Sequence, residues 1–234
     1  MILSVIIPCY NEENTILQIL EKVNLQKKNL EIEIIICDDG SSDNTVHNLK
    51  KNPQLYDKLI ENKVNLGKGS AIISARPYIK GDILIIQDAD LEYDPSDYKK
   101  LIEPIINHKS QVVYGSRVLK NGRYKNKSFT SLFRIFCNHI LTIISNIINK
   151  QKLTDAHTCY KVFKIDVFNK FFLKEKGFNF CPEITTKLSN SGIEILEVPI
   201  SYYGRTYDEG KKIRFIDGLI AILTIIKYKF FSSK

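Results

Sequence analysis

Three carboxylates stand at every second position between residues 87 and 95, and their chemistry is that of a divalent-cation site. Asp88, Asp90 and Glu92 follow the apolar run 83–86, which is typical of a strand buried on both faces of a mostly parallel sheet. Extended backbone places alternate side chains on one side, so we expect all three to face one cleft where the strand ends. Clustered carboxylates repel one another unless a cation lies between them, and hard oxygen ligands suit Mg²⁺ or Mn²⁺.

The alternative interpretation of this stretch is a solvated acidic turn that leads into a helix. Asp94 and Pro95 predict that helix, with Asp94 at the N-cap, Pro95 at the first helical position and Asp97 closing a capping box. The buried strand in front of the carboxylates favours the metal site.

Composition indicates one large domain of 234 residues in a reducing compartment. The five cysteines are odd in number and contain no C-x-x-C pair, which is typical of reduced thiols in a cytosolic protein. The formal net charge of +8 is compatible with an anionic partner. No arginine-rich tract or nucleic-acid motif is present, so we expect no nucleic-acid partner. Because a strand is predicted from residue 3 onward, we expect no signal peptide and a cytoplasmic protein.

The elements that must position the carboxylates alternate between strands and helices. Strands are expected at 3–8, 31–37, 58–61, 83–86 and 111–114, and helices at 11–25 and 67–78. Such alternation predicts an α/β fold with a doubly wound, mostly parallel sheet. The second half adds helices at 129–149, 182–191 and 214–230, and short strands at 160–164 and 194–199. We therefore expect one domain over 1–234, with a binding half (1–118), an acceptor half (119–212) and a C-terminal interfacial helix (213–234).

Seven motifs, in order along nearly the whole chain, resemble one enzyme family. They are SVIIPCYNEE (4–13), CDDGSSDNT (37–45), NLGKGSAI (65–72), QDADLEYDP (87–95), VVYGSRV (112–118), DAHTCYKVF (155–163) and VPISYYGRTYDEGKK (198–212). Together they are similar to the inverting family-2 glycosyltransferases of the GT-A fold, of the dolichol-phosphate mannose synthase type. The resemblance implies metal-dependent transfer of a sugar from a GDP- or UDP-sugar to a polyprenyl-phosphate.

The resemblance also implies a role for individual residues on the donor side. The residues that would hold the base and ribose are Pro8, Tyr10, Glu12 and Asp39. Those that would engage the diphosphate through Mg²⁺ or Mn²⁺ are Asp88, Ala89 and Asp90, supported by Glu92, where the family often has glutamine. Tyr10 offers a ring for stacking and Asp39 can accept hydrogen bonds from ribose hydroxyls. The alternative for 38–44 is a plain helix-capping turn.

On the acceptor side the resemblance implies contacts between basic residues and phosphate, with surface charges as the alternative. These residues are Arg117, Arg134, Arg205 and Lys211. Asp155 would face the acceptor, either as general base or as a positioning group, and with Asp90 makes up the predicted catalytic pair. Glu183 is a weaker candidate for the same role. Lys68 lies outside any P-loop spacing; we expect a solvated lysine, with an approach to the donor as the alternative.

The C-terminal segment raises the question of a membrane. The apolar run 218–226 spans only about 14 Å as a helix, whereas a bilayer core is roughly 30 Å thick. Lysines and arginines flank the run, so we expect a helix that lies at the membrane surface as a peripheral contact; the alternative is packing on the core or on a partner. Two other functions stay open, namely transfer to a hydroxyl of a saccharide or lipid-linked glycan and non-catalytic sugar-nucleotide binding.

Overall fold

The structure is a computed structural model that describes residues 1–119, 129–204 and 215–231; the side chains of 129–134 and 215 lie outside the description. The predicted residues Arg205 and Lys211 fall outside the described ranges. For Arg134 the structure describes only the backbone, in a helix.

The described residues form a mixed, mostly parallel sheet in the order β3-β2-β1-β4-β6-β5-β7. Its strands are β1 (Leu3–Cys9), β2 (Ile32–Asp38), β3 (Lys58–Glu61), β4 (Ile83–Ile86), β5 (Val112–Ser116), β6 (Lys161–Lys164) and β7 (Leu196–Pro199). Among these strands only β6 runs antiparallel, and it pairs with β4 on one side and β5 on the other. The predicted fold class is confirmed, with β6 joining the parallel segments of the two halves into one sheet.

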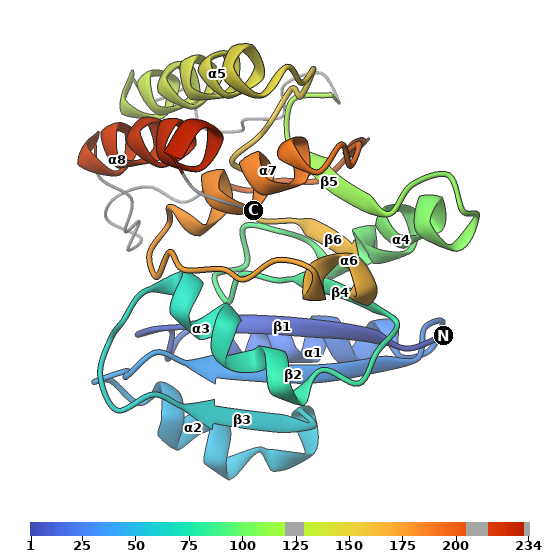
Figure 1. The fold of residues 1–234 in the computed structure, drawn as a ribbon. Coiled ribbons are helices and arrows are strands. Elements are labelled where there is room, and N and C mark those ends of the chain that lie inside the picture. The colour runs from blue at the N-terminus through green and yellow to red at the C-terminus, as the bar shows by residue number, and fades with distance from the viewer. Residues whose placement is uncertain (120–128, 205–214, 232–234) are drawn as a thin grey trace.

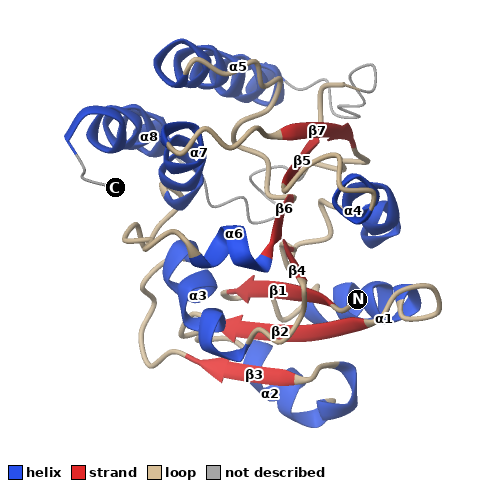
Figure 2. Ribbon diagram, turned by 45° about the vertical axis from the view of Figure 1, so that its right-hand side comes forward, coloured by secondary structure: helices blue, strands red, loops and turns tan. Residues whose placement is uncertain are grey.

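Helices cover both faces of this sheet (Figures 1 and 2). They are α1 (Ile16–Gln26), α2 (Thr45–Lys51), α3 (Lys68–Ala75), α4 (Tyr98–Ile106), α5 (Phe129–Asn149), α6 (Ile165–Asn169), α7 (Phe180–Asn190) and α8 (Phe215–Ile226). Figure 2 shows α3 and α6 on one face, with α1 and α4 on the other. Every residue of β1, β2 and β4 is buried, which explains their continuous apolar sequence.

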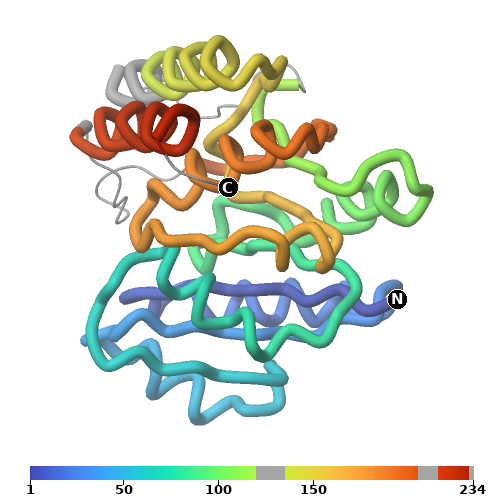
Figure 3. Tube along the Cα trace, in the orientation of Figure 1, coloured from blue at the N-terminus to red at the C-terminus, as the bar shows by residue number. Residues whose placement is uncertain are grey.

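The second half adds a pair of helices at one end of the molecule. In Figure 3, α5 in yellow and α8 in red lie side by side although they are far apart in the sequence. The short π-helical turn Lys227–Phe231 continues α8. No helix in the described part of the chain combines the length and the apolar character needed to cross a bilayer.

Three local predictions were wrong, each for a visible reason. Helix α1 begins at Ile16 rather than at residue 11, because Asn11 adopts a left-handed conformation (φ 51°) that turns the chain after β1. Helix α3 ends at Ala75 because Pro77 forces a 3-10 turn. Asp94 caps the amide of Ser96 as expected, but Asp97 forms no capping box. Its carboxylate instead accepts a hydrogen bond from the Ser201 amide at 2.6 Å.

Gly69 gives a test of how tightly α3 is fitted to the second half. A Cβ at Gly69 would lie 2.2 Å from the Glu175 carbonyl oxygen, which belongs to the backbone and cannot swing away. Gly69→Ala should therefore lower the free energy of unfolding by about 1–3 kcal/mol, as overpacking does. Ser74→Ala, on the same helix, should cost much less. Urea unfolding measures both, and a Gly69→Ala protein as stable as Ser74→Ala would contradict the packing.

Candidate functional site

A cavity of about 490 Å³ lies where β1, β2, β4 and β5 end. Apart from Asp155 and the weaker candidate Glu183, every predicted site residue whose side chain is described lines this cavity. These are Pro8, Tyr10, Glu12, Asp39, Asp88, Ala89, Asp90, Glu92 and Arg117. The sheet therefore brings together residues that are up to 109 positions apart in the sequence, counted from Pro8 to Arg117.

The three acidic residues reach this cavity through a turn rather than through extended backbone. The strand ends at Ile86, residues 89–92 form turns and bends, and Leu91 is left-handed with φ 62°. The Asp90 carboxylate stabilises the turn by accepting a hydrogen bond from the Glu92 amide at 3.1 Å. The prediction of a continuous extended stretch was wrong, but the turn still places all three residues in the cavity wall.

The side chain of a buried glutamine holds this turn in place through hydrogen bonds. Gln87 is fully buried, and its Oε1 accepts hydrogen bonds from the hydroxyls of Tyr98 and Tyr160, each at 2.7 Å. Its Nε2 donates to the Asp88 carbonyl at 2.9 Å. Burial raises the pKa of both tyrosines well above the ordinary value, so both remain donors. Sequence analysis missed Gln87, although a glutamine directly after an apolar strand signals a buried polar group that needs partners.

Glu92 points toward the second half of the chain. Its carboxylate, in a residue only 6% exposed, accepts a hydrogen bond from the Tyr202 hydroxyl at 2.8 Å. Its carbonyl accepts one from the Tyr203 amide at 2.9 Å. Glu92 therefore ties the acidic turn to the segment after β7.

The carboxylate oxygens in the cavity wall could supply some, but not all, of the ligands of a hard divalent ion. Asp88 and Asp90 offer carboxylate oxygens to the same cavity, which suits Mg²⁺ or Mn²⁺ with water or phosphate oxygens as further ligands. Within the described ranges no group of three or more His, Cys, Asp or Glu side chains is arranged to hold a metal ion. The three-carboxylate set that includes Glu92 is thus not assembled among these residues, whereas a metal held by the two aspartates stays a prediction.

Lys68 was expected in solvent, and that prediction was wrong. Its side chain is only 16% exposed and its ammonium forms an ion pair with Asp88. The Nζ also lies 3.4 Å from the Cys159 Sγ. Helix α3 begins at Lys68 and packs on β1 and β2, and the Lys68 side chain extends into the cavity wall to reach Asp88.

Asp39 holds the loop that precedes α3. Its carboxylate accepts hydrogen bonds from the amides of Leu66 and Gly67, the latter at 2.6 Å, and from the Asn62 side chain at 2.9 Å. The entry to α2 is instead stabilised by Asp43, which accepts from the Thr45 amide. Asp39 is therefore no helix cap, and its predicted contact with the nucleoside remains a prediction.

Arg117 and Asp155 form a buried bidentate ion pair. The Arg117 Nε and Nη2 donate to the two Asp155 oxygens at 2.6 and 2.8 Å, and Asn138 from α5 donates to the same carboxylate at 3.3 Å. Burial opposes the charge of Asp155, but the guanidinium more than compensates and lowers the pKa of the carboxyl from 3.8 to about 2. Asp155 is fully buried and does not line the cavity. The expectation that it faces the acceptor is corrected: it lies behind Arg117 and positions it.

Glu183, the weaker candidate, is structural. It is fully buried, accepts hydrogen bonds from the amides of Lys174 and Glu175, and pairs with Lys187 at 2.8 Å. Its carboxylate therefore holds the segment before α7 and is not directed at the cavity.

His157 also lines the cavity. Burial, together with the nearby Lys161 and Arg117 cations, lowers its pKa from 6.5 to about 4, so the imidazole is neutral near pH 7. Lys161 is itself buried and donates to the carbonyls of Ala156 and Thr158 at 3.1 and 2.6 Å. This lysine fixes the loop that carries both His157 and Asp155.

The Arg117–Asp155 pair predicts a pH-dependent stability. Because the folded pKa of Asp155 lies below its unfolded value, the pair stabilises the fold fully above about pH 4 and loses this contribution as the pH falls toward 2. Asp155→Asn should cost about 3–5 kcal/mol at pH 7, since it leaves a buried cation unpaired. The deficit relative to the wild type should shrink by about 2 kcal/mol toward pH 2.

Urea unfolding at several pH values measures this deficit. The double variant Arg117→Met with Asp155→Asn is the control, and it should be more stable than Asp155→Asn alone because no buried charge is left. A deficit that does not change with pH, or a double variant with simply additive losses, would contradict the pairing.

Comparison with known proteins first defines the class of fold. The solved structures of glucosyl-3-phosphoglycerate synthase from Mycobacterium tuberculosis superimpose with TM-scores of 0.69 for the complex with Mn²⁺, uridine diphosphate and phosphoglyceric acid and 0.72 for another crystal structure of the enzyme. They cover 99% of this chain and 80–82% of the synthase, at 16–17% identity. At such low identity the likeness shows the fold alone, and it is the GT-A type predicted from the motifs.

The family follows from the sequence. Residues 4–172 match the model of glycosyl transferase family 2, so the chain belongs to this family and is a glycosyltransferase. It is 29% identical to a dolichol-phosphate mannosyltransferase of Pyrococcus furiosus over 90% of this chain, but spans only 59% of that protein. It is also 31% identical to a UDP-N-acetylglucosamine–dolichyl-phosphate N-acetylglucosaminyltransferase of Methanococcus voltae, over 83% of each chain.

Proposed function

We propose that this protein transfers a sugar, with inversion and with the help of Mg²⁺ or Mn²⁺, from a nucleoside-diphosphate sugar to a polyprenyl-phosphate. The observation that carries the proposal is one cavity that joins the acidic turn after β4 to the apolar helices α5 and α8. Asp88 and Asp90 lie in its wall together with Leu141 of α5 and Ala221 of α8. A charged donor and an apolar acceptor can therefore meet in one space.

The donor would lie across the ends of β1, β2 and β4. Tyr10 and Asp39 line the cavity and would hold the nucleoside, while Asp88 and Asp90 line it where the diphosphate would bind. This is the carboxyl-end crevice at which open α/β sheets bind nucleotides. Two solved neighbours hold uridine diphosphate with Mn²⁺ or Mg²⁺, which supports a nucleoside-diphosphate sugar and one of these two ions here.

The reaction would be a displacement at the anomeric carbon. An acceptor phosphate oxygen forms the new bond to this carbon from the face opposite the diphosphate, while the bond to the β-phosphate oxygen breaks and the nucleoside diphosphate leaves. The bound ion would supply charge neutralisation on the leaving diphosphate. Arg117, whose Nε and Nη2 donate to Asp155, would present its remaining N–H groups to phosphate oxygens.

The geometry around Asp155 argues against this residue as the general base that a hydroxyl acceptor would need. A hydroxyl must lose a proton and needs a general base within reach. A carboxylate whose pKa is about 2, buried behind Arg117, is a poor base. A phosphate oxygen is already anionic near neutral pH and needs none.

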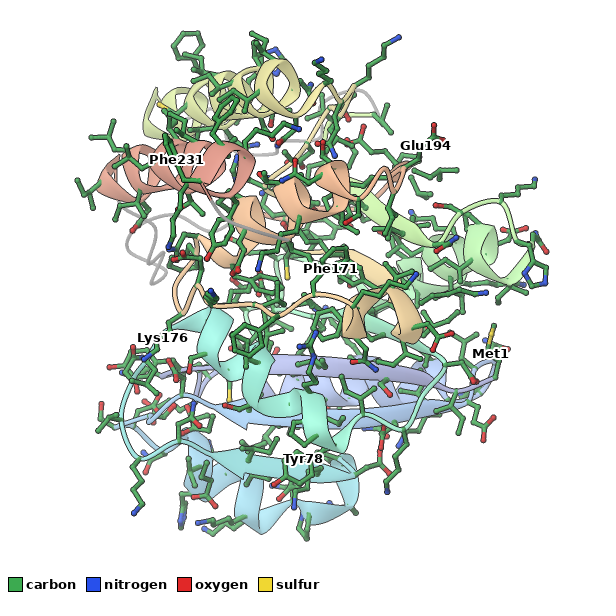
Figure 4. All side chains as sticks on the ribbon, viewed as in Figure 1. Met1, Tyr78, Phe171, Lys176, Glu194 and Phe231 are labelled. Atoms are coloured by element: carbon green, nitrogen blue, oxygen red, sulfur yellow. The ribbon has the colours of Figure 1, made fainter. Side chains whose placement is uncertain are left out.

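The exposed apolar faces of α5 and α8 support contact with a lipid surface. The exposed apolar side chains are Phe136, Ile140, Ile143 and Ile147 on α5, Ile216, Leu219, Ile220 and Leu223 on α8, and Phe230 and Phe231 after it. We name these residues the apolar face. Figure 4 shows Phe231 at this end of the molecule, far from Tyr78 beside β3. Lys227 and Lys229 flank the face, although Lys227 also pairs with Glu175 at 2.7 Å. An apolar face with basic flanks fits an anionic membrane surface, which we place at the cytoplasmic side.

The donor half of the proposal predicts metal-dependent nucleotide binding. Asp90→Asn should weaken the binding of UDP or GDP at least roughly tenfold with Mn²⁺ present and change it little in EDTA, because the carboxylate acts through the ion. Asp166→Asn, at an exposed position on α6, is the matched control and should bind like the wild type. Isothermal titration measures all three proteins. Equal wild-type affinity with Mn²⁺ and with EDTA would exclude the metal from donor binding.

The apolar face predicts binding to lipid vesicles. Leu223 on α8 is 65% exposed and Leu25 on α1 is 56% exposed. Leu223→Asp should weaken binding to anionic vesicles roughly 10- to 100-fold, since it removes about 1.5–3 kcal/mol of apolar transfer free energy. Leu25→Asp should have no effect. Vesicle flotation at increasing salt measures both, and wild-type flotation by Leu223→Asp would show that α8 does not face the lipid.

A further inference from the structure

We infer that Lys68 is an internal cation that competes with the divalent ion for Asp88 and transfers to the donor diphosphate when donor and ion bind together. The inference rests on the proposed donor and metal site and assigns a positioning residue to it. Its basis is the ion pair between the Lys68 ammonium and the Asp88 carboxylate, whose side chains are only 16% and 20% exposed. Both residues line the cavity.

The backbone around Lys68 is held in place, so a change of partner must come from its side chain. Asp39 accepts hydrogen bonds from the amides of Leu66 and Gly67 just before it. After it, the Ser70 amide donates to the Lys176 carbonyl at 2.9 Å, and Gly69 leaves no space against the neighbouring backbone. The lysine side chain, a flexible four-carbon stem with three donors, is the part that can move.

The charges in the cavity determine which partner the Lys68 side chain takes. An ammonium in contact with Asp88 neutralises part of the charge that a divalent ion would use, so the ion meets a weaker site while no donor is bound. A nucleoside diphosphate brings new anionic oxygens into the same cavity and offers Lys68 an alternative partner. Among the described residues the ammonium also lies 3.4 Å from the thiol of Cys159, which is a weak acceptor and does not compete with a diphosphate.

The exchange couples the two binding events. The affinity for the ion must rise when the nucleotide is bound, and by linkage the affinity for the nucleotide must rise by the same factor when the ion is bound. A lysine that merely stabilised the fold would create no such coupling. The two roles therefore predict different changes in the affinities for the ion and for the nucleotide when the charge of Lys68 is removed.

The experiment is a titration of the full chain with Mn²⁺ alone, followed by electron paramagnetic resonance of the free ion. Lys68→Met should bind Mn²⁺ about tenfold more tightly than the wild type, because Asp88 has lost its internal cation. At saturating Mn²⁺ the same variant should bind UDP and GDP about tenfold more weakly, because the diphosphate has lost a partner. Opposite changes in the two affinities are the signature of the exchange.

Three variants control this result. Lys68→Arg keeps the charge and should retain the wild-type affinity for Mn²⁺, whereas Lys68→Gln removes the charge but keeps a polar group and should behave like Lys68→Met. Lys50→Met removes a similar ion pair, with Glu61 at 2.8 Å, from the surface of α2 and β3, and should change neither affinity. Circular dichroism establishes that each variant is folded.

Two failures can be told apart. If the wild type binds UDP and GDP with Mn²⁺ but neither Lys68→Met nor Lys68→Gln gains affinity for Mn²⁺ alone, the exchange is wrong and the proposed function stands. If the wild type binds neither nucleotide with Mn²⁺, the proposed donor site is wrong and the role of Lys68 falls with it.

Discussion

The structure depends on how a polar turn is held at the end of a strand that is buried on both faces. Strand β4 supplies no polar side chains of its own, so the turn after it needs hydrogen-bond partners from other elements. Gln87 provides them by accepting from Tyr98 of α4 and Tyr160 next to β6, while it donates to the Asp88 carbonyl. One side chain thus connects the acidic turn to both halves of the sheet, and the cavity keeps its shape because this connection is buried.

The charged side chains around the turn form ion pairs, and the main effect of these pairs is to fix the orientation of each side chain. Buried ion pairs add little net stability, since desolvation offsets most of their attraction, but they hold each partner in one direction. Asp155 holds Arg117 with two hydrogen bonds, and Arg117 lies over the Tyr202 ring at 5.1 Å. A guanidinium fixed in this way meets a phosphate without first losing conformational freedom, which is the condition for electrostatic stabilisation during transfer.

Much of the fold was readable in the sequence because its signals are local. The apolar runs of β1, β2 and β4 predict buried parallel strands, and their ends predict where the cavity lies. The ion pairs between side chains could not be predicted, because they join residues that are far apart in the sequence. Lys68 pairs with Asp88, twenty residues further along the chain, and Arg117 pairs with Asp155, thirty-eight residues further along. The left-handed Leu91 was also missed, since a leucine gives no sign that it will adopt a positive φ.

The most direct test of the account is sugar transfer to two acceptors that share one tail. The purified protein is incubated with Mn²⁺, a radiolabelled GDP-mannose, UDP-glucose or UDP-N-acetylglucosamine, and either a polyprenyl-phosphate or the corresponding polyprenyl alcohol. The account predicts labelled lipid from at least one donor with the phosphate, none with the alcohol, and none in EDTA. Transfer to the alcohol or to a saccharide hydroxyl, with no transfer to the phosphate from any donor, would contradict it.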